Sequence, residues 1–166
     1  RVLFRSRRGI QRALEQALAD LRAGEHLCIA YLDLDRFKLI NDLYGHPAGD
    51  EVLLQVCQRV QGLLSPGMTF GRVGGDEFLL LMPQLPVDLA ALLCQGMTTA
   101  IGQEVYRVGE RAFQVGGSVG LAEIAAGTSA KDAIATADRA CRAAKRGTPL
   151  GLVVYEHDAS DFAEHH

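Results

Sequence analysis

Few backbone arrangements suit a glycine pair followed directly by two acids, as in Gly74-Gly75-Asp76-Glu77. This stretch lies between two short apolar segments, 68–70 and 79–82, that have the composition of strands. Glycine accepts positive φ and close approach by a ligand, so the pattern predicts a tight hairpin with both carboxylates at its tip. Alone, the pattern is equally typical of a solvated surface turn.

A second acidic pair, Asp33 and Asp35, follows the apolar run 27–32. Alternate residues of a strand share a face, so both carboxylates should point the same way while Leu34 points into the core. Two carboxylate pairs at strand ends need a cation, and a hard divalent ion prefers oxygen ligands. Metal-assisted phosphoryl or nucleotidyl transfer requires such sites, because the metal offsets phosphate charge and activates a hydroxyl.

Longer motifs around these acids resemble the GGDEF domain, the bacterial diguanylate cyclase module. Residues 74–78 reproduce the signature in full, and residues 33–50 resemble the family pattern DxDxFKxINDxxGHxxGD at every specified position. The resemblance continues through 117–122, Ala137-Asp138 and Ala144-Lys145. It implies a single domain over residues 1–166, excised from a longer multidomain protein, since only Arg7-Arg8 remains of the family's N-terminal DxLTGLxNRR motif.

The resemblance also implies roles for individual residues. Mg²⁺ or Mn²⁺ would be held by Asp33, the backbone carbonyl of Leu34, Asp76 and Glu77. The implied catalytic residues are Asp76 as proton acceptor, Glu77, and Lys38 as a charge-offsetting cation. The implied substrate-binding residues are Phe37, Asn41, His46, Asp50, Gly74, Gly75 and Lys145.

Some of these residues also have plain structural interpretations. The resemblance places Asn41 and Asp50 on the guanine base and Lys145 on the phosphates. Without it, Asn41 and Asp50 would be interpreted as helix-end and helix-capping residues, and Lys145 as a solvated lysine.

The implied reaction condenses two GTP into cyclic di-GMP and two pyrophosphates by attack of a ribose 3′-hydroxyl on the α-phosphate. Each domain would supply one GTP, so two GGDEF domains must meet as a transient homodimer. The alternative is a weak GTP-binding domain that regulates an attached module, such as an EAL phosphodiesterase. A related nucleotidyl cyclase is a further possibility, within which Asn41 and Asp50 favour guanine.

Two departures from the family pattern bear on this choice. Family members have Gly-Arg-Asn where this chain has Thr148-Pro149-Leu150, so a phosphate-binding arginine is absent unless Arg146 replaces it. Loss of one charge-assisted contact would cost about 1.5–3 kcal/mol of binding, which favours the regulatory alternative. Ser65 and Met68 replace the RxxD product-inhibition motif, so no inhibitory site of that type is expected.

Composition restricts the class of protein and its partners. The chain has 166 residues, 48% hydrophobic and 22% charged, which is typical of one globular domain. A net charge of −3 argues against a general nucleic-acid surface. No signal peptide or apolar run of about 18 residues is present, so we expect a cytoplasmic domain without direct membrane contact, fused in its parent to sensor or EAL domains. Its four cysteines, Cys28, Cys57, Cys94 and Cys141, are expected to be buried thiols.

Apolar periodicity predicts helices at about 10–24, 37–44, 49–64, 86–101 and 129–146, and further strands at 27–34, 105–108, 113–119 and 152–155. The predicted inner faces include Leu63 in the third helix and Leu89, Leu92, Leu93 and Met97 in the fourth. No regular βαβ repeat is present, so we expect an α/β fold of the α+β sandwich type, with helices around a mainly antiparallel sheet. The resemblance implies the palm-like fold of nucleotide cyclases and polymerases. No metal role is assigned to His165-His166.

Overall fold

The computed structural model describes residues 4–147 and 151–155. The predicted segment 148–150 and His165-His166 lie outside these ranges. The elements of the described residues are, in chain order, β1 (Phe4–Arg5), α1 (Arg7–Asp20), β2 (Leu27–Asp35), α2 (Phe37–Tyr44), α3 (His46–Gln61), β3 (Thr69–Arg72), β4 (Glu77–Pro83), α4 (Val87–Gly102), β5 (Tyr106–Val108), β6 (Arg111–Phe113), β7 (Gly116–Glu123), α5 (Ala130–Lys145) and β8 (Leu152–Tyr155).

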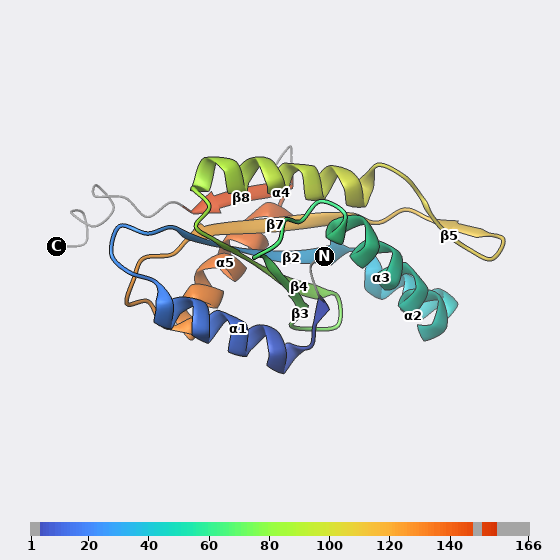
Figure 1. Ribbon diagram of the computed structural model, residues 1–166. Coiled ribbons are helices and arrows are strands. Elements are labelled where there is room, and N and C mark those ends of the chain that lie inside the picture. Colours follow the sequence, from blue (N-terminus) through green and yellow to red (C-terminus); the bar gives the residue numbers. More distant parts are fainter. Residues whose placement is uncertain (1–3, 148–150, 156–166) are drawn as a thin grey trace.

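Six of the strands form one sheet in the order β1-β3-β4-β2-β7-β8, with β2 near the centre. The pairs β3–β4, β4–β2 and β2–β7 are antiparallel, whereas the outer pairs β1–β3 and β7–β8 are parallel. The predicted α+β fold with a mainly antiparallel sheet is therefore confirmed. The strands β5 and β6 form a separate two-stranded ribbon that extends from one end of the domain (Figure 1).

Helices cover both faces of the sheet (Figure 1). Even-numbered residues of β2 (Cys28, Ala30, Leu32 and Leu34) pack with α2, α3 and α4, whereas Leu27, Ile29 and Tyr31 pack with α1 and α5. This alternation follows from the two-residue period of a strand. Asp33 and Asp35 continue the odd series, so they share the α5 side while Leu34 is buried on the other, as predicted.

Two helices differ from the prediction. The helix expected at 49–64 begins at His46, because Gly45 alone, with φ +91°, turns the chain between α2 and α3. The buried residues of α4 are Ala90, Cys94, Met97 and Ile101. Leu89 and Leu92 are 52% and 62% exposed, and Leu63 is 40% exposed, so their predicted inward orientation was wrong. The side chains that α4 buries therefore recur every three or four residues along the helix.

One strand prediction also needed correction, and one strand was missed. The single strand predicted at 113–119 is divided between two strands, since β6 ends at Phe113 and β7 begins at Gly116. The two-residue strand β1 was not predicted. Cys28, Cys94 and Cys141 are buried and Cys57 is partly buried, all as free thiols.

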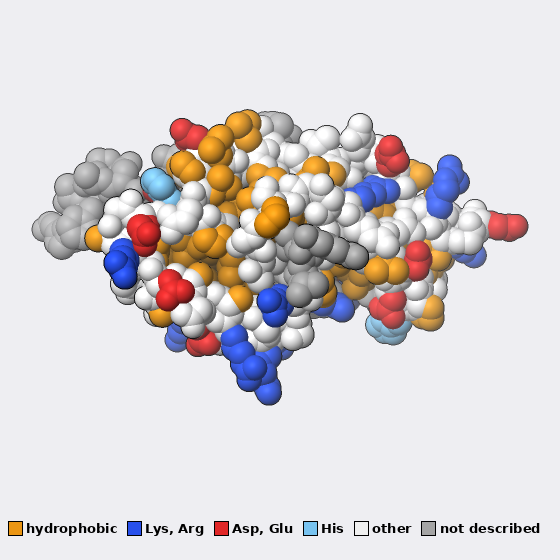
Figure 2. Space-filling model, viewed as in Figure 1, with side chains coloured by type: hydrophobic (Ala, Val, Ile, Leu, Met, Phe, Trp, Pro, Cys, Tyr) orange, Lys and Arg blue, Asp and Glu red, His pale blue; other side chains and the backbone are white. Residues whose placement is uncertain are grey.

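The surface agrees with the composition. On the face shown in Figure 2, basic side chains are interspersed with acidic ones, apart from a small basic group over α1. Among the described residues, no helix is long and apolar enough to cross a membrane.

Candidate functional site

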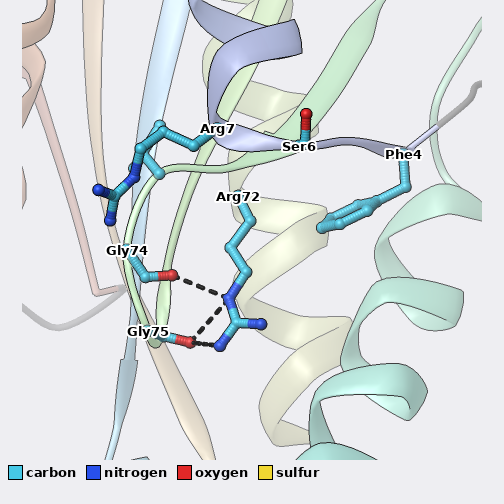
Figure 3. A pocket seen from close by; sticks show the side chains of 7 residues that line it. Phe4, Ser6, Arg7, Arg72, Gly74 and Gly75 are labelled. Carbon is cyan, nitrogen blue, oxygen red and sulfur yellow. Dashed lines mark hydrogen bonds between the residues drawn. The ribbon is translucent and has the colours of Figure 1, made fainter.

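The glycine pair forms the turn between β3 and β4, as predicted. The Val73 and Gly74 amides donate to the Glu77 carbonyl at 2.9 and 3.2 Å. From the end of β3, the Arg72 Nε donates to the Gly74 carbonyl at 2.9 Å and the Gly75 carbonyl at 3.0 Å, and Nη2 also donates to Gly75. Figure 3 shows this guanidinium reaching the two carbonyls, beside a cavity of about 390 Å³ whose lining includes Phe4, Ser6 and Arg7. The arginine therefore fixes the backbone path of the turn.

Gly74 is required for space and not for a special φ. Neither Gly74 nor Gly75 has positive φ, which was the conformational reason expected for them. A Cβ on Gly74 would lie 2.5 Å from the Glu77 Oε1, whereas a Cβ on Gly75 would meet nothing within 4 Å. The turn thus folds the Glu77 carboxylate back over Gly74.

The two acidic pairs meet at one end of adjacent strands. Asp33 pairs in register with Glu77, and the Leu34 amide donates to the Asp76 carbonyl at 3.0 Å. From the last turn of α5, the Lys145 Nζ lies 3.3 Å from the Asp33 Oδ1 and 3.2 Å from the Asp35 Oδ1. Residues from the 33–35, 76–77 and 145 segments therefore form one charged cluster.

Burial governs the electrostatics of this cluster. Burial is the largest of the effects that together raise the pKa of Asp33 to about 6; the Lys145 ammonium lowers this pKa, and the negative charges of Asp76 and Glu77 raise it. Partial burial lowers the pKa of Lys145, but the carboxylates of Asp33 and Asp35 outweigh this effect, so its pKa is raised. The negative charges of these carboxylates would also stabilise an additional positive charge bound next to Asp33.

The oxygen atoms present suit a hard divalent cation. The Asp33 Oδ1 is buried, and Lys145 is close enough for an ion pair but is not aligned for a hydrogen bond. No three His, Cys, Asp or Glu side chains among the described residues converge into a ready cage. Mg²⁺ on nucleotides commonly takes one or two carboxylates plus phosphate oxygens, so Asp33 with a carboxylate of the glycine turn fits this demand.

The predicted base-binding residues lie where α2 meets α3. The Asn41 Oδ1 is buried without a hydrogen-bond partner among the described residues, and a Cβ on Gly49 would lie 1.8 Å from it. Phe37 is 3% exposed and belongs to the core beneath Gly49. Asp50 is exposed and lines a cavity of about 430 Å³, together with Phe4, Leu53, Leu54, Cys57, Gln61, Arg72 and Phe78.

Two predicted residues stand apart from the charged cluster. Lys38 and His46 are exposed, and neither side chain makes a hydrogen bond or ion pair with a described residue. Conversely, sequence reasoning missed the contacts of Arg72 with the turn and of Ser118 with Asp35. The place of Ser118 in the 117–122 motif was the one sequence feature that could have drawn attention to it. Phe4, which lines both cavities, belongs to no motif that the sequence analysis identified.

Comparisons with known proteins agree with this geometry. Residues 4–148 match the family described as "Diguanylate cyclase, GGDEF domain". The chain is 34% identical to "Probable diguanylate cyclase DgcE" of Escherichia coli K12 over 77% of the chain and 12% of that protein. It is 36% identical to "Cyclic di-GMP phosphodiesterase PdeB" of Shewanella oneidensis over 88% of the chain and 17% of that protein. The chain thus spans less than a fifth of these relatives.

Solved structures share the fold. The GGDEF domain of DgcB from Caulobacter crescentus, in complex with c-di-GMP, superposes with a TM-score of 0.85 at 26% identity over 92% of each chain. Diguanylate cyclase SiaD from Pseudomonas aeruginosa, in complex with its activator SiaC, superposes with a TM-score of 0.84 at 32% identity over 90% of this chain and 58% of that chain.

Proposed function

Because the chain belongs to the GGDEF domain family, we propose that it is a diguanylate cyclase domain that condenses two GTP into cyclic di-GMP and two pyrophosphates. The observation that supports this most is the charged cluster of Asp33, Asp76, Glu77 and Lys145 at one end of the central strands. It combines carboxylates for a divalent cation with a lysine for phosphates.

Residues of this cluster would hold Mg²⁺ or Mn²⁺ through Asp33, the Leu34 carbonyl, Asp76 and Glu77. When bound, the metal supplies polarisation of the α-phosphate and a lower pKa for the 3′-hydroxyl. Asp76 accepts the hydroxyl proton as the new oxygen–phosphorus bond forms and the bond to pyrophosphate breaks.

Cationic side chains would act on the phosphates. Lys145 exchanges a carboxylate partner for the triphosphate and holds it. Lys38 has no partner among the described residues, so its side chain is available to offset charge that develops in the transition state. Gly74 and Gly75 would allow the substrate to approach the backbone of the turn closely, and a Cβ on Gly75 would meet nothing within 4 Å.

Base recognition would come from the junction of α2 and α3. The carboxylate of Asp50 accepts the N1 and N2 hydrogens of guanine, and the amide of Asn41 serves the other edge of the base. Phe37 supports this region from the core, and His46 lies beside it at the start of α3.

The reaction joins two nucleotides, so one domain carries half of the site. A second GGDEF domain must therefore meet it face to face, as a transient homodimer. The four free thiols suit a reducing compartment, so we place this domain in the cytoplasm, whatever its parent carries.

A regulatory role is the second candidate. It is favoured by Thr148-Pro149-Leu150 at the family's phosphate-binding positions and by the likeness to PdeB, which is named a phosphodiesterase. In that case the domain binds GTP and controls an attached EAL module without forming product.

One experiment separates the two candidates. Concentrated protein is incubated with GTP and Mg²⁺, and cyclic di-GMP is followed by chromatography with Asp76→Ala as control. Product that appears with the unaltered chain and is lost in the variant supports the cyclase. GTP binding by calorimetry without product, repeated with the chain dimerised through a fused coiled coil, supports the regulatory domain.

A further inference from the structure

We propose that Ser118 and Asp35 form a positioning pair that holds the Lys145 ammonium at the strand end where the triphosphate binds. The inference rests on the proposed function for the identity of this substrate. The link between the three side chains is a separate claim, which can be measured without nucleotide.

The three side chains form a continuous chain of contacts. The Ser118 hydroxyl lies 3.2 Å from both carboxylate oxygens of Asp35 and donates to them. The Asp35 Oδ1 in turn accepts from the Lys145 Nζ at 3.2 Å. Ser118 is 3% exposed, so its hydroxyl is shielded from water. A buried hydroxyl with a single proton therefore fixes the orientation of a half-exposed carboxylate.

Glycines of β7 create the space for this arrangement. A Cβ on Gly116 would lie 3.3 Å from the Asp35 Oδ2. A Cβ on Gly120 would lie 2.2 Å from backbone atoms of α5, so the helix rests directly on the strand there. The Cys141 thiol also donates to the Ser118 carbonyl at 3.3 Å. These contacts fix the distance of the last turn of α5, and hence of Lys145, from the end of β2.

Asp35 is better suited than Asp33 to act as a lasting anchor. Asp33 is the more buried of the two, with a side chain 17% exposed against 40% for Asp35, and it is the proposed metal ligand. When Asp33 turns to a metal, Asp35 remains as the acceptor for Lys145. A lysine side chain loses considerable rotamer freedom when it is fixed, so one that is held beforehand binds phosphate at a lower entropic cost.

A double-mutant cycle tests the role in substrate binding. The ligand is the α,β-methylene analogue of GTP with Mg²⁺, in which the bond to be cleaved is replaced by a stable one, and its affinity is measured by calorimetry. Ser118→Ala keeps the net charge of the site and should weaken binding about three- to tenfold. In a Lys145→Met background the same substitution should change affinity less than about twofold, because its effect passes through the lysine.

A matched serine controls for damage to α5. Ser129 caps the opposite end of the helix by accepting from the Asp132 amide at 3.1 Å. Ser129→Ala should lower the melting temperature but leave affinity for the analogue unchanged. If Ser118→Ala weakens binding equally with and without Lys145, its role is structural and the positioning pair is wrong.

NMR of the lysine ammonium tests the link without nucleotide. Ser118→Ala and Asp35→Asn should each speed exchange of the Lys145 Nζ protons with water, whereas Ser118→Thr, which keeps the hydroxyl, should restore the slow exchange. An unchanged Lys145 signal in both variants overturns the inference. An unaltered chain that fails to bind the analogue contradicts the proposed function instead, and the NMR result still decides the link.

Discussion

Asp33 should make the unliganded domain less stable as pH rises, and Asp33→Asn should remove this effect. Burial raises the pKa of Asp33 from 3.8 to about 6 in the folded chain. Between these values the folded state holds a proton that the unfolded state has lost, so stability falls as pH increases through this window. Above pH 6 the ionised carboxylate of Asp33 lowers the free energy of unfolding by a constant amount.

The size of the effect follows from the shift. A difference of about two pKa units corresponds to roughly 3 kcal/mol, and relaxation of the charged cluster reduces this to about 1–3 kcal/mol. Asparagine resembles the neutral acid, so Asp33→Asn should match the unaltered chain at pH 4 and be about 1–3 kcal/mol more stable at pH 8. The substitution should also abolish cyclase activity.

Urea unfolding without divalent cations, at several pH values from 4 to 8, measures this difference. Other carboxylates are common to both chains, so their titration cancels. Asp138→Asn is the matched control, since the ion pair that Asp138 makes within the described part of the chain is an i,i+4 pair with Arg142 at 3.6 Å. This control should change stability by less than about 0.5 kcal/mol at either pH. A stability difference for Asp33→Asn that is independent of pH, or that favours the unaltered chain at pH 8, would refute the reasoning.

Four further substitutions test the backbone around the site. The Cβ added by Gly74→Ala would lie 2.5 Å from the Glu77 Oε1 and displace this carboxylate, so turnover should fall about tenfold or more, with a stability loss below about 1 kcal/mol. Gly75→Ala should affect turnover less, because its Cβ would meet nothing within 4 Å. Gly120→Ala pushes against backbone of α5 at 2.2 Å and should lower the free energy of unfolding by about 2–4 kcal/mol in a denaturant titration. In Arg72→Lys the ammonium cannot bridge two carbonyls as the guanidinium does, so turnover should fall about tenfold while the circular dichroism spectrum is unchanged. Unchanged turnover in Gly74→Ala or in Arg72→Lys would show that the backbone path of the turn is unimportant for catalysis.

Much of the architecture could be predicted from local patterns. The strand at 27–34 was recognisable because residues on both faces are apolar, and the same alternation placed Asp33 and Asp35 together. The glycine turn was recognisable from its composition. The pairing of β1 with β3, and the extent of β7 along β2, depend on contacts between distant segments, which local composition does not encode.

The misphased face of α4 has a physical reason. Leucine is more hydrophobic than alanine or cysteine, so the pattern favoured Leu89 and Leu92 as core residues. The residues that α4 buries are instead Ala90, Cys94, Met97 and Ile101, which recur every three or four residues, and because apolar residues occur on both faces the sequence pattern did not decide between them.

The site was predictable as a set of residue types but not as a set of contacts. The acids and Lys145 were identified, and the structure brings Asp33, Glu77 and Lys145 together. The support from Ser118 was not predictable, because a serine in a strand gives no sign of which carboxylate it meets 83 residues away.

Product formation by a forced dimer tests the central claim most directly. The chain is fused to a parallel dimeric coiled coil, incubated with GTP and Mg²⁺, and compared with its Asp76→Ala variant by chromatography. The cyclase proposal predicts cyclic di-GMP and pyrophosphate from the fused dimer, much less from the dilute monomer, and none from the variant. A fused dimer that binds GTP but forms no cyclic di-GMP would contradict it.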